Sequence, residues 1–161
     1  VREVDKRTGL SSSAAHWMAI AAMNMYGYYI ADLGLPTIEP LNLEELRNAR
    51  TAVVLPYVLL RRYDELPHSW DVTSDSIAVW LAAKLGVREV VKVTAAGGLV
   101  EDGKVVEKVD ARALYGRETI VDRFAPRLMV EYGIDMFVCG VEELKDYILR
   151  GRARGTLIEG R

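Results

Sequence analysis

The apolar and polar positions of this chain alternate between helical and strand spacing from one end to the other. Apolar residues recur every three to four positions after serines 11–13, which predicts a capped helix ending near Asp32. The expected buried stripe of that helix is Ala14, Trp17, Met18, Ala21, Ala22 and Met25. The same spacing predicts shorter helices at 42–48, 74–85, 111–115, 126–132 and 142–149.

Short apolar runs rich in β-branched residues predict strands at 52–60, 89–93, 136–139 and 156–158. The run at 89–93 is typical of a buried strand. Pro56 lacks an N–H donor, so the strand at 52–60 should be irregular or lie at an edge. Segment 99–109 predicts a hairpin that turns at Asp102-Gly103. This order of elements favours an α/β fold with a mainly parallel sheet and helices on both faces.

Composition limits the classes of protein that need to be considered. The 161 residues are half hydrophobic and carry a net charge of −2, which favours one domain over 1–161 and argues against a general nucleic-acid binder. We expect the only cysteine, Cys139, to be a buried apolar side chain in a reducing compartment. Neither a membrane span nor a secretory leader is evident, so a cytoplasmic location is expected.

The residues best suited to chemistry lie between 70 and 100. Hydroxyl side chains surround Asp75 where a helix must begin, and these are Thr73, Ser74 and Ser76. Thr94 and Gly97-Gly98 follow the strand at 89–93, and ligands of open α/β sheets bind at that end of a strand. A hydroxyl group and glycine backbone at such a position suit a phosphate.

The charges of Asp75 and Lys92 each leave two interpretations open. A lysine in a largely buried strand needs a partner, which can be a phosphate or a carboxylate. Asp75 lies in a first helical turn, where it can act as a simple cap or can orient a lysine or a metal ion.

A second group of candidate residues pairs imidazole with indole rings. His16 and Trp17 are adjacent, and His68 lies two positions before Trp70. Trp17 also suits a core, whereas His68 falls in a loop, where polar residues more often serve binding. Two histidines and one cysteine do not supply a metal-ligand set, and Walker A, GxGxxG and GxSxG motifs are missing from the sequence.

Four segments together resemble the amino acid kinase superfamily, which includes uridylate kinase and acetylglutamate kinase. They are AHWMAIAAMNMYG, the run VTSDSIAVWLAAKLGVREVVKVTAAGGL, the later TIVDRFAPRLMVEYGIDMFVCG and the closing GTLI. Within the superfamily they are most similar to an archaeal and methylotroph branch that includes the small-molecule kinase of methanofuran biosynthesis. The resemblance implies a three-layer αβα sandwich of the carbamate kinase type.

The resemblance also implies roles for individual residues, with ATP and Mg²⁺ as cofactors and a small-molecule acceptor. Asp75 matches the acid that organises the catalytic lysine, and Lys92 is a second catalytic candidate. Nucleotide contacts are implied for Thr73, Ser74, Thr94, Gly97 and Gly98. The acceptor site is implied for His16, Trp17, His68 and Trp70, while 123–126 would lie near the adenine.

The sequence also departs from the pattern of this superfamily. Members begin with a K-x-G-G-S loop and a later G-G-G turn, and neither motif is in this sequence. The implied fold is therefore truncated at its N-terminus and misses two strands. Ala95 and Gly97 replace the two aspartates of the T-D-V-D-G loop. We therefore expect a nucleotide-binding kinase-like protein, impaired or inactive as this chain, that forms a homo-oligomer. The alternative is a non-catalytic storage oligomer on the same fold, similar to the molybdenum storage protein.

Overall fold

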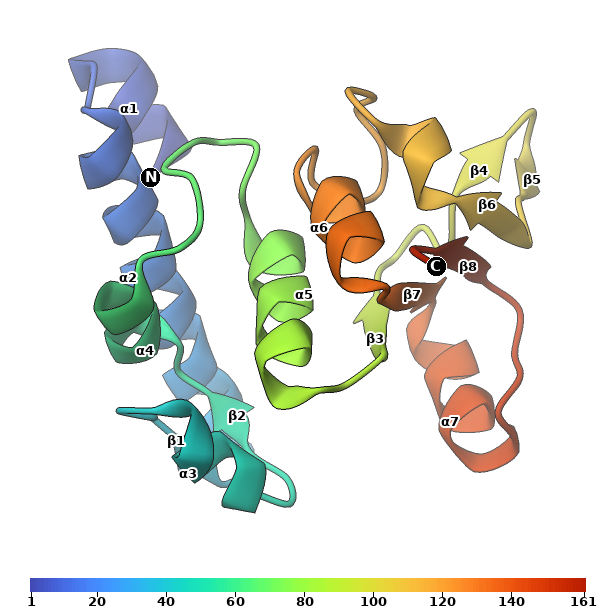
Figure 1. The fold of residues 1–161 in the computed structure, drawn as a ribbon, viewed down its shortest axis with the longest axis horizontal. Coiled ribbons are helices and arrows are strands. Elements are labelled where there is room, and N and C mark those ends of the chain that lie inside the picture. The colour runs from blue at the N-terminus through green and yellow to red at the C-terminus, as the bar shows by residue number, and fades with distance from the viewer. The chain divides into compact units, whose positions relative to one another are not determined.

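The computed structural model describes residues 1–161, which form two compact units, Val1–Trp70 and Asp71–Arg161. Unit 1 comprises α1 (Arg2–Thr8), α2 (Ser12–Ala31), β1 (Thr37–Ile38), α3 (Leu43–Asn48), β2 (Val53–Val54) and α4 (Tyr57–Tyr63) (Figure 1). The Ser11 hydroxyl accepts a hydrogen bond from the Ala14 N–H and caps α2, as the sequence predicts. β1 and β2 pair in parallel as a separate two-stranded sheet.

The strand predicted at 52–60 is wrong beyond its first residues. Only Val53–Val54 is extended, and Pro56 is the N-cap residue of α4. A proline suits a helix start because its fixed φ is near helical and the first N–H groups of a helix need no intrahelical partner. The apolar residues Leu59 and Leu60 are then buried on a helix rather than on a strand.

The buried stripe predicted for α2 is also wrong. The buried positions are Ala15, His16, Ile20, Asn24 and Gly27, whereas the predicted stripe residues Met18 and Met25 are exposed. Apart from Ile20, the packing face consists of small and polar residues. Asn24 Oδ1 accepts a hydrogen bond from the Tyr57 N–H at 3.2 Å, and Gly27 leaves room for the Leu55 side chain.

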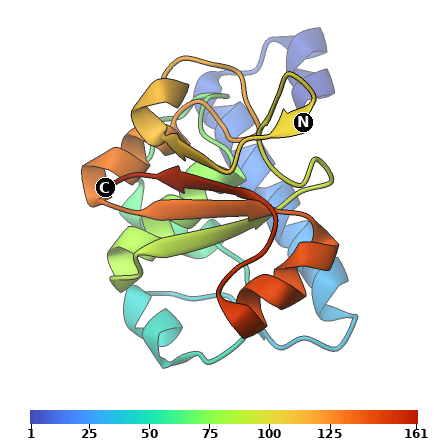
Figure 2. The same cartoon turned by 90° about the vertical axis from the view of Figure 1, so that its right-hand side faces the viewer.

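Unit 2 carries the larger sheet. Its helices are α5 (Ser74–Leu85), the 3₁₀ helix η1 (Ala111–Leu114), α6 (Ala125–Tyr132) and α7 (Val141–Arg150). Its strands are β3 (Glu89–Val93), β4 (Val100–Glu101), β5 (Lys104–Val105), β6 (Lys108–Asp110), β7 (Asp135–Cys139) and β8 (Thr156–Glu159). The sheet has the order β3-β7-β8-β6 (Figure 2). The pairs β3–β7 and β6–β8 are parallel, while β7–β8 is antiparallel.

Strand β7 is fully buried at the centre of this sheet and has helices on both faces. Phe137 stacks on Tyr147 of α7 with ring centroids 3.9 Å apart. Neighbouring residues point to opposite faces, so Met136 and Val138 face away from α7, and Figure 1 shows α5 and α6 on that other side. These layers confirm the predicted α/β class and the mainly parallel sheet.

Strand β3 lies at the edge of the sheet, so the prediction of a buried strand at 89–93 is wrong. Its residues alternate between exposed and half-buried, and Val91 is 37% exposed. The predicted hairpin is confirmed over residues 100–105, where β4 and β5 pair antiparallel across Asp102-Gly103. Its predicted extension to Val109 is wrong, because residues 108–110 form β6 and pair with β8 in the main sheet. Both turn residues have positive φ, 48° and 77°, as a type I′ turn requires.

None of the helices has both the length and the apolar character that crossing a membrane requires.

Candidate functional site

The first part of the candidate site is an ion pair between α5 and the end of β3. Lys92 Nζ lies 2.7 Å from Asp75 Oδ1 and 2.6 Å from Asp75 Oδ2. Asp75 is only 8% exposed. It does not cap its own helix, because its carboxylate binds Lys92 and the Asp122 N–H instead, the latter at 2.9 Å from Oδ2. Of the two partners considered for Lys92, the structure therefore shows the carboxylate, and of the two roles considered for Asp75 it shows the orientation of a lysine.

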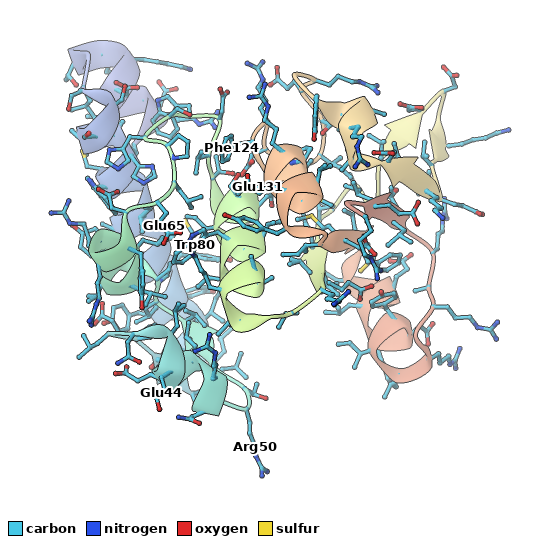
Figure 3. The ribbon with its side chains drawn as sticks, viewed as in Figure 1. Glu44, Arg50, Glu65, Trp80, Phe124 and Glu131 are labelled. Atoms are coloured by element: carbon cyan, nitrogen blue, oxygen red, sulfur yellow. The ribbon has the colours of Figure 1, made fainter.

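Asp122 organises the start of α5, and sequence reasoning missed it. Its carboxylate accepts hydrogen bonds from the N–H and hydroxyl groups of both Thr73 and Ser76. It also accepts from the N–H groups of Phe124 and Ala125, where α6 begins; Phe124 is labelled in Figure 3. An aspartate shortly before Ala125-Pro126 is a recognisable helix-start signal for α6, but the link to α5 depends on tertiary structure.

The loop after β3 carries the predicted phosphate-binding residues. The Thr94 N–H donates to the Cys139 carbonyl at 2.9 Å, and the Gly97 N–H donates to the Thr94 carbonyl at 3.0 Å, which closes a tight turn. Gly97 and Gly98 both have positive φ, 69° and 151°. A Cβ on Gly98 would lie 2.7 Å from Val105 Cγ1 and 2.8 Å from Thr156 Oγ1, so the loop passes too close to its neighbours for a side chain there.

Thr156 holds the base of the hairpin against this loop. It is fully buried, and its hydroxyl accepts from the Leu99 N–H at 2.8 Å and donates to the Val106 carbonyl at 2.6 Å. A single side chain of β8 therefore joins the two ends of the hairpin.

A cavity of about 430 Å³ opens beside the loop. Its lining residues come from the loop, the hairpin, the start of α7 and the segment before β8: Thr94, Ala95, Ala96, Gly97, Val105, Gly140, Val141, Glu142, Glu143 and Arg154. The start of α7 at Gly140 has no side-chain cap, and residues 140–143 of this helix start line the cavity. Sequence reasoning did not assign Arg154 or the start of α7 to the site.

The chemistry of this lining fits a polyphosphate accompanied by a divalent cation. The Thr94 hydroxyl and the helix start offer hydrogen-bond donors, and Arg154 adds a positive charge. Mg²⁺ in such sites binds one or two carboxylates together with substrate phosphates, and Glu142 and Glu143 supply carboxylates. The structure contains no group of three or more His, Cys, Asp or Glu side chains that could hold a metal ion by protein ligands alone.

The second set of predicted residues gathers in unit 1. His16 and His68 stack with ring centroids 4.3 Å apart, and Trp17 meets both rings edge-on. His68 also bridges Ser13 and Asp64, with its Nδ1 2.8 Å from Ser13 Oγ and its Nε2 2.8 Å from Asp64 Oδ1. The imidazoles that the sequence separates by 52 positions thus form one cluster.

The remaining predicted residues lie apart from these clusters or have structural partners. The Trp70 indole N–H donates to Asp5 at 2.7 Å, and the Arg2 guanidinium lies over the Trp70 ring. Ser74 is exposed at the first position of α5. The Thr73 hydroxyl donates to Asp122, as described above.

Burial shifts the acid–base behaviour of two site residues. Burial, followed by the neighbouring His68, lowers the pKa of His16, which favours the neutral imidazole. Burial, followed by the charge of Glu143, raises the pKa of the Cys139 thiol. Cys139 is thus the inert buried residue that the sequence predicts.

Comparison with known proteins agrees with this geometry. The chain is 31% identical over 145 residues to the [5-(aminomethyl)furan-3-yl]methyl phosphate kinase of Methanocaldococcus jannaschii. The match covers 86% of this chain and 66% of that kinase, just under two thirds of its length. No family model matches the chain.

Two solved structures with a similar fold are kinases of uridylate. The UMP kinase of Ureaplasma parvum has a TM-score of 0.71 at 14% identity, over 98% of this chain and 75% of that one. The uridylate kinase of Archaeoglobus fulgidus has a TM-score of 0.69 at 19% identity, over 97% and 77%. These structures show the fold alone, and the relative from M. jannaschii supports placing the chain in the amino acid kinase superfamily.

Proposed function

We propose that this chain binds ATP with Mg²⁺ through unit 2, as a small-molecule kinase does. The observation that carries the proposal is the Asp75–Lys92 pair, whose lysine lies near the end of β3. Lys92 is two residues before Thr94, the first of the loop residues that line the cavity. A lysine held by a buried carboxylate is preorganised to meet the charge of a transferring phosphate. The Thr94 hydroxyl supplies a further donor for a phosphate oxygen at this loop.

We assign the acceptor to the ring cluster of unit 1. The relative from M. jannaschii is named for an acceptor that combines a furan ring, an amine and a phosphate. The half-buried rings of Trp17 and His68 can contact a flat ring, with His16 packed against both of them. The exposed Asp64 carboxylate can receive an ammonium group. A small aromatic amine is therefore the acceptor class that we propose for this chain.

Nucleotide binding is tested by calorimetry on the whole chain with ATP and Mg²⁺. Replacing Lys92 with methionine removes a charge-assisted contact, so the affinity should fall on the order of 10- to 100-fold. Lys108→Met is the matched control, because Lys108 pairs with a carboxylate on the surface of the same unit, 2.8 Å from Glu159. Absence of ATP binding at millimolar concentration, or equal losses in the two variants, would contradict the proposal.

We further propose that phosphoryl transfer by this 161-residue chain is slow. The loop after β3 carries Ala95 and Gly97 where the related loops carry aspartates, so it lacks two anchoring side chains. Loss of one preorganised stabilising group typically costs about 10² to 10³ in rate. An ADP-release assay against a panel of amines, alcohols and phosphate monoesters should give background turnover. Rates near 1 per second, the typical scale, that disappear in Asp75→Asn would overturn this proposal.

A homo-oligomer is the assembly that the exposed surface of α2 favours. Met25 is 74% exposed, Tyr26 and Tyr29 are each 63% exposed, and methionine and tyrosine are enriched in protein interfaces. A second copy of the chain is the proposed occupant of this face, and a reducing compartment such as the cytoplasm is the proposed setting. Sedimentation equilibrium should give a species larger than 18.0 kDa that Met25→Lys dissociates. A single 18.0 kDa species at micromolar concentration would refute the assembly.

A further inference from the structure

We propose that Asp122 is the positioning residue that holds the Asp75 carboxylate against Lys92. The inference rests on the proposed function only in taking the Asp75–Lys92 pair to be the phosphate-facing pair. The positioning itself depends on contacts within unit 2 and can be tested without nucleotide.

The Asp122 carboxylate is saturated with hydrogen bonds, three on each oxygen. Oδ2 accepts from Thr73 N at 2.8 Å, Thr73 Oγ1 at 3.0 Å and Ser76 N at 2.9 Å. Oδ1 accepts from Ser76 Oγ at 2.6 Å, Phe124 N at 3.2 Å and Ala125 N at 2.8 Å. A carboxylate with this many donors is fixed in both position and orientation.

The same carboxylate caps two helices that lack caps of their own. Neither the N-cap residue of α5, Thr73, nor that of α6, Phe124, makes a side-chain cap hydrogen bond. The negative charge of Asp122 therefore serves the free N–H groups and the positive dipole ends of both helices. The first turn of α5, which carries Asp75, is thereby tied to the segment that enters α6.

A direct contact completes the link to Lys92. The Asp122 backbone N–H donates to Asp75 Oδ2 at 2.9 Å, and the same oxygen lies 2.6 Å from Lys92 Nζ. The side chain of Asp122 thus fixes the helix that bears Asp75, while its backbone fixes the carboxylate of Asp75. Both contacts are lost together if segment 122–125 shifts. No comparable network holds the exposed lysine–carboxylate pair of the same unit, Lys108–Glu159.

The test measures how fast Lys92 reacts with an amine acylating reagent in the full chain, read peptide by peptide by mass spectrometry. In the parent chain Lys92 should react slowly, because both oxygens of Asp75 hold its ammonium group and its side chain is only 22% exposed. Asp122→Asn turns one acceptor oxygen into an NH₂ donor that faces N–H groups, so segment 122–125 should shift. Lys92 should then react about 5- to 20-fold faster, on the scale of one lost charge-assisted hydrogen bond, with Lys108 unchanged as an internal reference.

Asp135→Asn is the matched control for loss of stability. Asp135 is also a buried acid of unit 2 whose carboxylate accepts a backbone N–H, that of Gly160 at 3.0 Å. In the strand register, Asp135 of β7 lies opposite Glu89, which is at the other end of β3 from Lys92. This variant should lower the melting temperature without changing the reactivity of Lys92. Equal acceleration in Asp122→Asn and Asp135→Asn would overturn the inference, as would unchanged reactivity in a folded Asp122→Asn chain.

A milder variant covers the case in which Asp122→Asn fails to fold. Ser76→Ala removes only the 2.6 Å hydroxyl contact to Asp122 Oδ1, so Lys92 should react about 2- to 4-fold faster. Unchanged reactivity there would also overturn the inference. ATP affinity of the parent chain, measured separately, tests the proposed function. A chain that binds no ATP but shows the labelling pattern would reject that function and keep Asp122 as the positioning residue.

Discussion

Removing the charge of Lys92 should destabilise unit 2 by more than removing the whole ion pair. Lys92→Met leaves the carboxylate of Asp75 buried, with only the Asp122 N–H as a partner. Breaking a fully buried pair typically costs about 3 to 5 kcal/mol. Because the side chains of Lys92 and Asp75 are 22% and 10% exposed, water screens part of this cost, and we expect about 2 to 3 kcal/mol. In the double variant Asp75→Asn/Lys92→Met, the amide oxygen keeps the Asp122 hydrogen bond and no charge is buried, so about 1 kcal/mol or less should be lost.

The assay is urea unfolding of the parent, both single variants and the double variant, followed by circular dichroism and tryptophan fluorescence. Coincidence of the two signals checks that unfolding is two-state. The coupling energy of the cycle should be about 1.5 to 2.5 kcal/mol, with the double variant more stable than Lys92→Met. If the double variant loses as much stability as Lys92→Met alone, the buried carboxylate is not what destabilises the single variant.

Three further outcomes can be checked independently. Burial lowers the pKa of His16, so as the pH falls the imidazole takes up a proton in the unfolded chain before it does so in the folded chain. The contribution of neutral His16 to the stability of the fold is therefore complete above about pH 6.5 and is lost as the pH falls below that value. Thermal melts at acidic and neutral pH should show this loss, and His16→Gln should reduce it. Gly98→Ala should cost more than Gly116→Ala in urea unfolding, because both glycines have positive φ but only Gly98 is crowded; equal losses would reject the crowding argument. Tyr147→Phe should cost about 1 kcal/mol through the lost 2.6 Å hydrogen bond to Glu89, and an unchanged unfolding midpoint would contradict this.

Much of unit 2 follows from local sequence signals. The helix before Gly86, the strand at 89–93 and the Asp102-Gly103 turn depend on spacing and turn chemistry that act within a few residues. Unit 1 was harder to predict, because apolar content misleads where packing uses small and polar side chains. The buried face of α2 includes Asn24 and Gly27, and no rule based on hydrophobicity selects these two residues.

The candidate site divides in the same way. Asp75 and Lys92 could be identified because a charge near a buried strand demands a partner, and the structure brings them together. Asp122 could not be identified, because it lies 47 positions from Asp75 and its role depends on how two helix starts meet in space. The stacking of His16 on His68 is likewise tertiary, although each residue was a binding candidate on its own.

The hydroxyl of Thr156 has a consequence for local motion in the hairpin. The hydroxyl accepts from the Leu99 N–H, before the first strand of the hairpin, and donates to the Val106 carbonyl, after the second strand. The base of the hairpin therefore cannot open unless this buried side chain loses both hydrogen bonds. Amide hydrogen exchange should therefore be slow at Leu99 and fast at the turn around Asp102, although both lie outside the main sheet. Movement of this hairpin over a bound ligand would then bend its tip, while its base remains a fixed wall beside the cavity.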